Sequence, residues 1–154
     1  MHVIVATDGS RASLAAARQF KWIADSREIT DVTIVAVVSP YAAVPFANEL
    51  GDPKPTELTA LSFSQDAQAA VDLVAAEFDG WGPTIHKQVR SGSPAQEIIR
   101  AAEDVDADLI SLASGSRGLS RTILLGSTAS RVQHSAPCAV LVCRPTSNSE
   151  RAWG

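Results

Sequence analysis

The chain has no excess of basic residues and few aromatic ones. Its 13 Lys and Arg residues stand against 17 Asp and Glu residues, which gives a net charge of −4 at pH 7. Proteins that attract nucleic acid through a general field are basic, so the composition argues against that class. An anionic ligand would need a local site. With aromatic residues at 5%, the core is expected to pack through small and β-branched side chains.

Long apolar runs and paired cysteines are also lacking. No segment reaches the roughly 18 apolar residues that a membrane span requires, and the beginning of the chain does not resemble a signal peptide. Cys138 and Cys143 lie in a segment that we expect to form one strand. Their odd separation points them to opposite faces, so they cannot form a disulfide. We therefore expect free thiols and a cytoplasmic, reducing location.

Short apolar segments alternate with helical patterns along the chain. The expected strands are His2–Thr7, Val32–Val38, Thr84–Val89, Asp108–Ala113 and Ala139–Cys143. The expected helices run from Ser10 to about Ser26, over Thr56–Phe78, from Pro94 onward and over Ser127–His134. This alternation predicts a single α/β domain with a doubly wound parallel sheet and helices on both faces. The polar segment Thr84–Val89 is expected near a sheet edge.

Two of these helices are predicted from apolar positions that recur at roughly helical spacing. In the first helix these are Leu14, Ala17, Phe20, Trp22 and Ile23. In the second helix they are Leu58, Leu61, Ala69, Val71, Leu73, Val74 and Phe78. The proline-rich connection from Ser39 to about Lys54 separates this second helix from the strand before it. A connection of that length in a compact domain is usually functional or mobile.

Glycines follow the fourth expected strand, where a doubly wound sheet binds its ligands. Gly115, Gly118 and Gly126 would let the backbone approach a ligand closely. The amides of Ser127 and Thr128 would be free donors at a helix N-terminus, which suits a phosphate. The alternative is a glycine-rich turn in which Ser127 is an ordinary N-cap.

Charged side chains accompany these glycines. Arg117 and Arg121 could pair with phosphate oxygens. Asp8 ends the first strand, where its carboxylate could accept hydrogen bonds from a ribose or a base amine, or help to hold a metal ion. The alternative for Asp8 is an Asx-turn that caps the first helix.

Several catalytic motifs are absent or incomplete. The chain has no G-x-x-x-x-G-K-[ST] phosphate loop and no G-x-G-x-x-G after its first strand. Ser114–Gly118 is similar to a nucleophile elbow but lacks the first glycine. A triad of Ser116 with His134 would also need a well-placed acid. His2, His86 and His134 form no metal-binding pattern by spacing.

Several motifs together resemble the universal stress protein family. They follow the family's order and are Val3–Ser10, Gly92–Ile99, Asp106–Ile110, Ser114–Gly118, Leu124–Ser127 and Ala136–Val142. The resemblance covers about residues 2–144, so we expect one domain there and a flexible tail over 145–154. It implies a five-stranded sheet in the order 3-2-1-4-5. It also implies a homodimer, often paired through the last strand, 138–143.

The resemblance further implies an ATP site above the first, second and fourth strands. The residues expected to contact adenine or ribose are Ala6, Thr7, Asp8 and Val37. Those expected around the ribose and phosphates are Ser114, Gly115, Ser116, Arg117, Gly118, Leu119, Ser120, Gly126, Ser127, Thr128 and Ala129. One departure concerns the loop Leu119–Leu125, whose seven residues are two fewer than in the family's nucleotide-binding pattern. Two residues span at most about 7 Å, so their absence could remove one phosphate contact or simply tighten a surface loop.

These features favour a regulatory dimer that acts in the stress response and binds ATP, with or without Mg²⁺. Hydrolysis would be slow at most, since neither a Walker lysine nor an evident general base is present. One alternative is a stress-response dimer that binds no nucleotide and acts through protein contacts. Another is a weak ATP hydrolase. We expect neither membrane nor nucleic acid as a partner.

Overall fold

Helices and strands alternate throughout the part of the chain that the structure describes. This computed structural model describes residues 1–39, 57–115 and 126–144. Its elements are β1 (His2–Thr7), α1 (Arg11–Ile23), the 3₁₀ turn η1 (Ser26–Glu28), β2 (Asp31–Val38), α2 (Glu57–Ala76), β3 (Thr84–Ser91), α3 (Pro94–Asp104), β4 (Leu109–Ala113), α4 (Ser127–Ser135) and β5 (Ala139–Cys143). The predicted strands are confirmed to within two residues. Most of the proline-rich connection, and all of the predicted tail at 145–154, lie outside the described residues.

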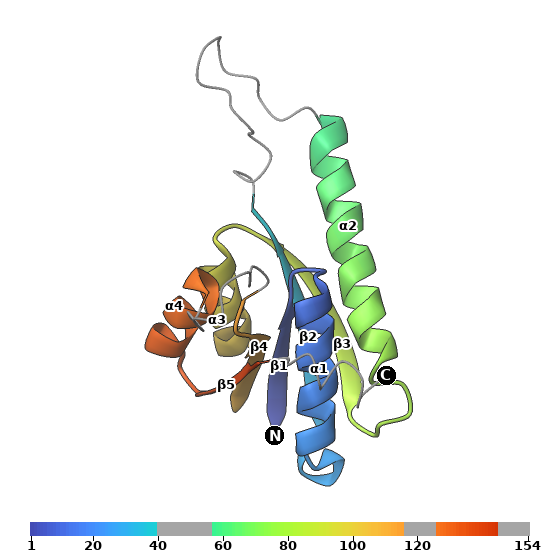
Figure 1. Ribbon diagram of the computed structural model, residues 1–154, viewed down its shortest axis with the longest axis vertical. Helices are drawn as coiled ribbons and strands as arrows, with labels where there is room; N and C mark the ends of the chain where they lie inside the picture. Colours follow the sequence, from blue (N-terminus) through green and yellow to red (C-terminus); the bar gives the residue numbers. More distant parts are fainter. Residues whose placement is uncertain (40–56, 116–125, 145–154) are drawn as a thin grey trace.

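The sheet has five strands in the order β3-β2-β1-β4-β5, as predicted (Figure 1). Every neighbouring pair is parallel. The chain moves outward from β1 to β3 and then returns to β4 on the other side of β1. The strand order therefore reverses between β1 and β4, where a doubly wound sheet binds its ligands. The polar strand β3 is an edge strand, as its sequence predicted.

Each face of the sheet is covered by two helices. Helices α1 and α2 pack on one face, and α3 and α4 pack on the other. Strand β1 contributes to both layers because Val3 and Val5 point to the first face and Ile4 to the second. All three are at most 2% exposed. Burial on both faces explains why this segment is continuously apolar instead of alternating.

Some of the apolar residues of α1 and α2 are on the surface. Trp22 is 67% exposed and Ile23 is 50% exposed. Two residues correspond to about 200° of helical rotation, so Trp22 lies opposite the buried Phe20. Ile23 is the last residue of α1. Leu73 of α2 is also 53% exposed, and it borders the cavity described below.

The helix starts follow the predicted caps with one difference. Ser10 caps α1, and its Oγ accepts a hydrogen bond from the Ser13 amide at 3.1 Å. Ser93 is the N-cap of α3 and Pro94 follows it, but the Ser93 side chain makes no capping bond within the described residues. Helix α1 ends at Ile23, earlier than predicted, and Asp25 then caps the short turn η1.

The two cysteines are free thiols, as predicted. Cys143 is buried in β5, and its Sγ lies 3.8 Å from the Ser111 Oγ. Cys138 lies immediately before β5 instead of within it. Burial raises the pKa of both thiols, which keeps them protonated and weakly nucleophilic at neutral pH. Within the described residues, no helix is both long and apolar enough to cross a bilayer.

A nearly buried carboxylate joins the end of β3 to α3. The Glu97 side chain bonds to the Arg90 Nε at 3.0 Å and to an Arg100 guanidinium nitrogen at 2.8 Å. Arg90 also reaches Asp104 at 2.9 Å. Gly92 leaves room for this group, since a Cβ there would lie 3.0 Å from the Glu97 Cγ. The hydrogen bond from Arg90 is the main cause that lowers the pKa of Glu97.

This network gives a testable pH dependence. Because the folded pKa of Glu97 is lowered, its contribution to stability is present above the unfolded pKa and is lost as the pH falls through the folded one. Glu97→Gln should lower the free energy of unfolding at pH 7 by about 1.5–3 kcal/mol, the value of hydrogen bonds to a charged group. The difference from the unsubstituted protein should shrink between about pH 5 and pH 3.

Urea denaturation at several pH values measures this effect. Glu103→Gln is the matched control, because Glu103 is an exposed carboxylate on the same helix. Equal stability of Glu97→Gln and the unsubstituted protein at pH 7 would contradict the role given to the network.

Candidate functional site

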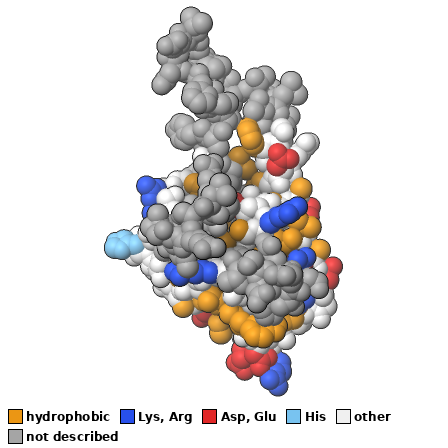
Figure 2. Space-filling model, in the orientation of Figure 1, with side chains coloured by type: hydrophobic (Ala, Val, Ile, Leu, Met, Phe, Trp, Pro, Cys, Tyr) orange, Lys and Arg blue, Asp and Glu red, His pale blue; other side chains and the backbone are white. Residues whose placement is uncertain are grey.

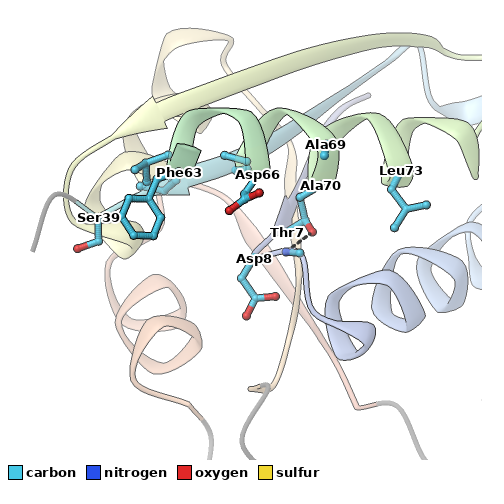
Figure 3. Close-up of a pocket in the computed structure, with 13 residues that line it drawn as sticks. Thr7, Asp8, Ser39, Phe63, Asp66, Ala69, Ala70 and Leu73 are labelled. Carbon is cyan, nitrogen blue, oxygen red and sulfur yellow. Dashed lines mark hydrogen bonds between the residues drawn. The ribbon is translucent and has the colours of Figure 1, made fainter. Parts of the chain in front are cut away.

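A cavity of about 510 Å³ opens where β1 and β2 end beneath α2 (Figure 3). Volumes of this order are typical of small-molecule sites. The strands and the turn after β1 contribute Thr7, Asp8, Gly9, Ala36, Val37, Val38 and Ser39. Helix α2 contributes Phe63, Asp66, Ala67, Ala69, Ala70 and Leu73. The cavity lies next to the reversal of strand order, so its position is the one that the topology predicts for a ligand.

The turn after β1 is fixed by hydrogen bonds of its own side chains. The Thr7 hydroxyl lies 2.9 Å from the Ser13 hydroxyl and accepts a bond from the Gly9 amide at 3.2 Å. The Asp8 carboxylate accepts a bond from the Ser10 amide at 3.0 Å. The Asx-turn considered for Asp8 is therefore present, and the same residue also lines the cavity. This turn holds Asp8 in place at the cavity wall.

Close packing against this turn positions α2. Gly9 has a φ of +77°, and a Cβ at that position would lie 3.3 Å from the Ala70 Cβ. Glycine at 9 and alanine at 70 let the helix approach the end of β1 closely. Asp66 and Phe63 lie one and two turns before Ala70, so they occupy the same side of the helix. The contact at Ala70 therefore brings both side chains to the cavity.

The start of α4 also rests against the end of a strand. The Gly126 amide donates a hydrogen bond to the Ser114 carbonyl at 2.6 Å. A Cβ at Gly126 would lie 3.0 Å from that oxygen. Gly115, at a φ of +149°, is in a region that favours glycine. The Gly126 amide is therefore bonded within the protein, to the residue that follows β4.

The amides that follow Gly126 remain at the helix N-terminus. Gly126 is the N-cap of α4, and Ser127 is its first helical residue. The alternative in which Ser127 is the N-cap is therefore wrong. The amides of the first helical turn have no acceptor within the helix, so those of Ser127 and Thr128 point outward from its positive end. Ser127 is exposed and Thr128 is half-buried.

The predicted site residues fall into three groups. Thr7, Asp8 and Val37 line the cavity. Ala6 and Ala129 are 7% and 2% exposed and lie in the core beneath α3 and α4, so their side chains do not face the cavity. The residues at the end of β4 and the start of α4 are outside the described cavity lining. They are Ser114, Gly115, Gly126, Ser127 and Thr128.

The remaining predicted residues lie outside the described part of the chain. These are Ser116, Arg117, Gly118, Leu119 and Ser120, together with Arg121. The described residues thus form two neighbouring features at one end of the sheet. One is the cavity below α2, and the other is the N-terminus of α4.

The α2 residues of the cavity were not predicted as site residues. Phe63, Asp66, Ala70 and Leu73 are separated by three, four and three positions, which places them along one side of the helix. The carboxylate of Asp66 points from α2 toward the strand ends where Asp8 lies (Figure 3). The signal that could have found them is an acidic residue within an otherwise apolar helical stripe.

Charge on the surface is mixed. Figure 2 shows Lys and Arg side chains interspersed with Asp and Glu side chains on the viewed face, without a field of one sign. This agrees with the net charge of −4. Any attraction of an anion must therefore come from the local site.

The contact between Gly126 and Ser114 gives a second prediction. The φ of Gly126 is −58°, which any residue adopts, so an added Cβ acts only through its contact with Ser114. Gly126→Ala should lower the free energy of unfolding by about 1–3 kcal/mol, as overpacking of a close contact does. Urea denaturation measures this loss.

Ser127→Ala is the neighbouring control, because Ser127 is exposed at the next position. It should change the free energy of unfolding by no more than about 0.5 kcal/mol. If both variants were equally stable, the backbone contact would not be what holds α4 against β4.

Comparisons with known proteins agree on one family. The model of the universal stress protein family matches residues 1–144. The universal stress protein MJ0531 of Methanocaldococcus jannaschii is 37% identical over 144 residues, which cover 92% of this chain and 81% of that protein. The match includes the whole described sheet and all its helices.

Two solved structures share the fold. A universal stress protein in complex with cAMP has a TM-score of 0.67 at 21% identity, over 95% of this chain and 98% of that one. A universal stress protein family protein from Arabidopsis thaliana with AMP bound has a TM-score of 0.66 at 16% identity, over 96% and 94% of the two chains. From the family match, the relative and the strand order together, the chain belongs to the universal stress protein family.

Proposed function

We propose that this protein binds an adenine nucleotide, ATP by preference, and acts as a regulatory dimer in the cytoplasm. The observation that carries the proposal is the cavity in which Thr7, Asp8 and Val37 meet. It lies at the end of the sheet where the strand order reverses. The relatives bound to cAMP and AMP support an adenine ligand. The two free thiols fit a reducing compartment.

In this proposal the two features at the sheet end bind different parts of the nucleotide. The base and ribose occupy the cavity beside Asp8 and Val37. The phosphates extend toward α4, where the amides of Ser127 and Thr128 donate hydrogen bonds to them. Gly126 takes no part through its amide, which is bonded to Ser114. Its role is to let α4 approach β4 closely.

Binding is proposed as the activity, with slow hydrolysis at most. Among the described residues, no three His, Cys, Asp or Glu side chains are grouped to hold a metal ion. A Mg²⁺ ion that arrives with ATP would therefore be held mainly by phosphate oxygens and water. Among the described residues that line the cavity, the titratable groups are Asp8 and Asp66.

Isothermal titration calorimetry with ATP, with and without Mg²⁺, tests the proposal. We expect a dissociation constant of about 1 mM or lower, equivalent to roughly −4 kcal/mol or better. Gly115→Val should weaken binding at least about tenfold. The added side chain would meet the backbone of Gly126 and strain a φ of +149°.

Gly80→Val is the matched control for that substitution. Gly80 also has a positive φ, +68°, but a Cβ there would meet no atom within 4 Å. Both variants carry backbone strain, and only Gly115 lies at the proposed site. The absence of heat with the unsubstituted protein, or an equal loss of affinity in both variants, would contradict nucleotide binding at this site.

A dimer through the last strand, residues 138–143, is the second part of the proposal. Strand β5 ends the sheet, and Val140, Leu141 and Val142 stay partly exposed along it. An edge of this kind is stabilised when it is covered by another chain. Sedimentation equilibrium should give about twice the 16.2 kDa of one chain. Ala139→Glu, at an exposed position of β5, should shift the mass toward the monomer.

One observation favours a second candidate, a stress-response dimer that acts through protein contacts without a nucleotide. The bonded Gly126 amide leaves one donor fewer for phosphate, and the preceding loop is short. Calorimetry separates the two candidates. A dimer that gives no heat with ATP would support the second.

A further inference from the structure

We propose that α2 selects the base of the bound nucleotide, with Asp66 accepting a hydrogen bond from the exocyclic amine of a 6-aminopurine and Phe63 packing against its ring. This inference rests on the proposed nucleotide binding and adds a specificity determinant to it. Neither residue belongs to the motifs by which the family is recognised in this sequence. The role of these two residues is therefore argued from their place in the cavity.

The charge of the cavity decides which part of a nucleotide can enter it. The charged side chains among its described lining residues are Asp8 and Asp66, and both are acidic. Two carboxylates repel a phosphate group, which carries the same sign of charge. The positive helix end and its amides lie instead at α4. The uncharged base is thus the part of the ligand favoured beside Asp66.

The shape of the cavity suits a flat ring. Its wall on β2 includes Val37, and its wall on α2 includes Ala67 and Ala70, whose short side chains leave space between the helix and the strands. Phe63 is half-buried and lies close to Ser39 at one end of the cavity (Figure 3). An aromatic side chain at this place can pack against the face of a base, and this packing is available to every base because all of them have a flat aromatic face. Phe63 therefore contributes affinity more than selectivity.

Selectivity requires a polar group, and Asp66 provides it. An ionised carboxylate only accepts hydrogen bonds, so it pairs with an amino group and repels a carbonyl oxygen. The carboxylate of Asp66 points away from the backbone of α2 and toward the strand ends (Figure 3). The helix is fixed there by the contact of Ala70 with Gly9. The backbone at Asp66 is therefore held above the strand ends, and its exposed carboxylate can reach a base in the cavity and distinguish a 6-amino from a 6-oxo group.

A comparison of ATP with inosine triphosphate tests this role, because the 6-amino donor of adenine is replaced by a 6-oxo acceptor in hypoxanthine, with N1 changing from acceptor to N–H donor beside it. Calorimetry on the full chain should show that the protein binds ATP about tenfold more tightly, as one hydrogen bond to a charged group can provide. Asp66→Asn should reduce this preference to about twofold or less, since an amide can either donate or accept. Phe63→Ala should lower the affinity for both ligands by a similar factor.

Asp79→Asn is the matched control, because Asp79 is an exposed carboxylate just beyond the end of α2 and outside the described cavity lining. It removes the same charge and should keep the preference for ATP. Equal affinities of the unsubstituted protein for the two ligands, or an unchanged preference in Asp66→Asn, would overturn the role of Asp66 and leave nucleotide binding intact. Failure of both ligands to bind would overturn both proposals.

Discussion

Burial of β1 on both faces is the constraint on which the rest of the structure depends. Val3, Ile4 and Val5 have almost no exposed surface, so helices must pack above and below this strand. The chain meets that requirement by winding first to one side of β1 and then to the other. The end of β1 thereby becomes the place where the two halves of the sheet diverge. Thr7 and Asp8 stand at that place because of the packing behind them.

Two close backbone approaches then shape the two sides of the site. On one side Gly9 lets α2 lie against the end of β1, and on the other Gly126 lets α4 lie against the end of β4. Both contacts depend on the absence of a side chain. The first leaves a cavity below the helix. The second includes a hydrogen bond from the Gly126 amide to the Ser114 carbonyl, so this amide is not available to a ligand. A glycine near a ligand site can thus serve the packing of the protein itself.

The fold could be predicted from the sequence because apolar strands and helical patterns repeat in strict alternation. The spacing of apolar residues did not show that Trp22 and Ile23 are exposed, since a hydrophobic residue near a helix end need not face the core. The start of α4 after Gly126 and the turn formed by Asp8 after β1 were also predictable from local turn residues. The hydrogen bond of the Gly126 amide was not predictable, because its acceptor Ser114 comes from another part of the backbone. The α2 lining was missed for a related reason: local periodicity shows which side of a helix is apolar, but not where a gap remains beneath it.

The pairing of Gly92 with Glu97 has a consequence for how this chain can vary. A Cβ at 92 would lie 3.0 Å from the Glu97 Cγ, and the Glu97 carboxylate is joined to Arg90 and Arg100. Positions 92 and 97 are therefore coupled, and neither is free to drift alone. A shorter residue at 97 would clear the space for a side chain at 92, but it would not relieve the strain at a φ of +146°, and the two arginines would lose their common partner. Glycine at 92 thus meets two separate requirements, the backbone conformation and the space for the Glu97 side chain, so the loop before α3 tolerates little change.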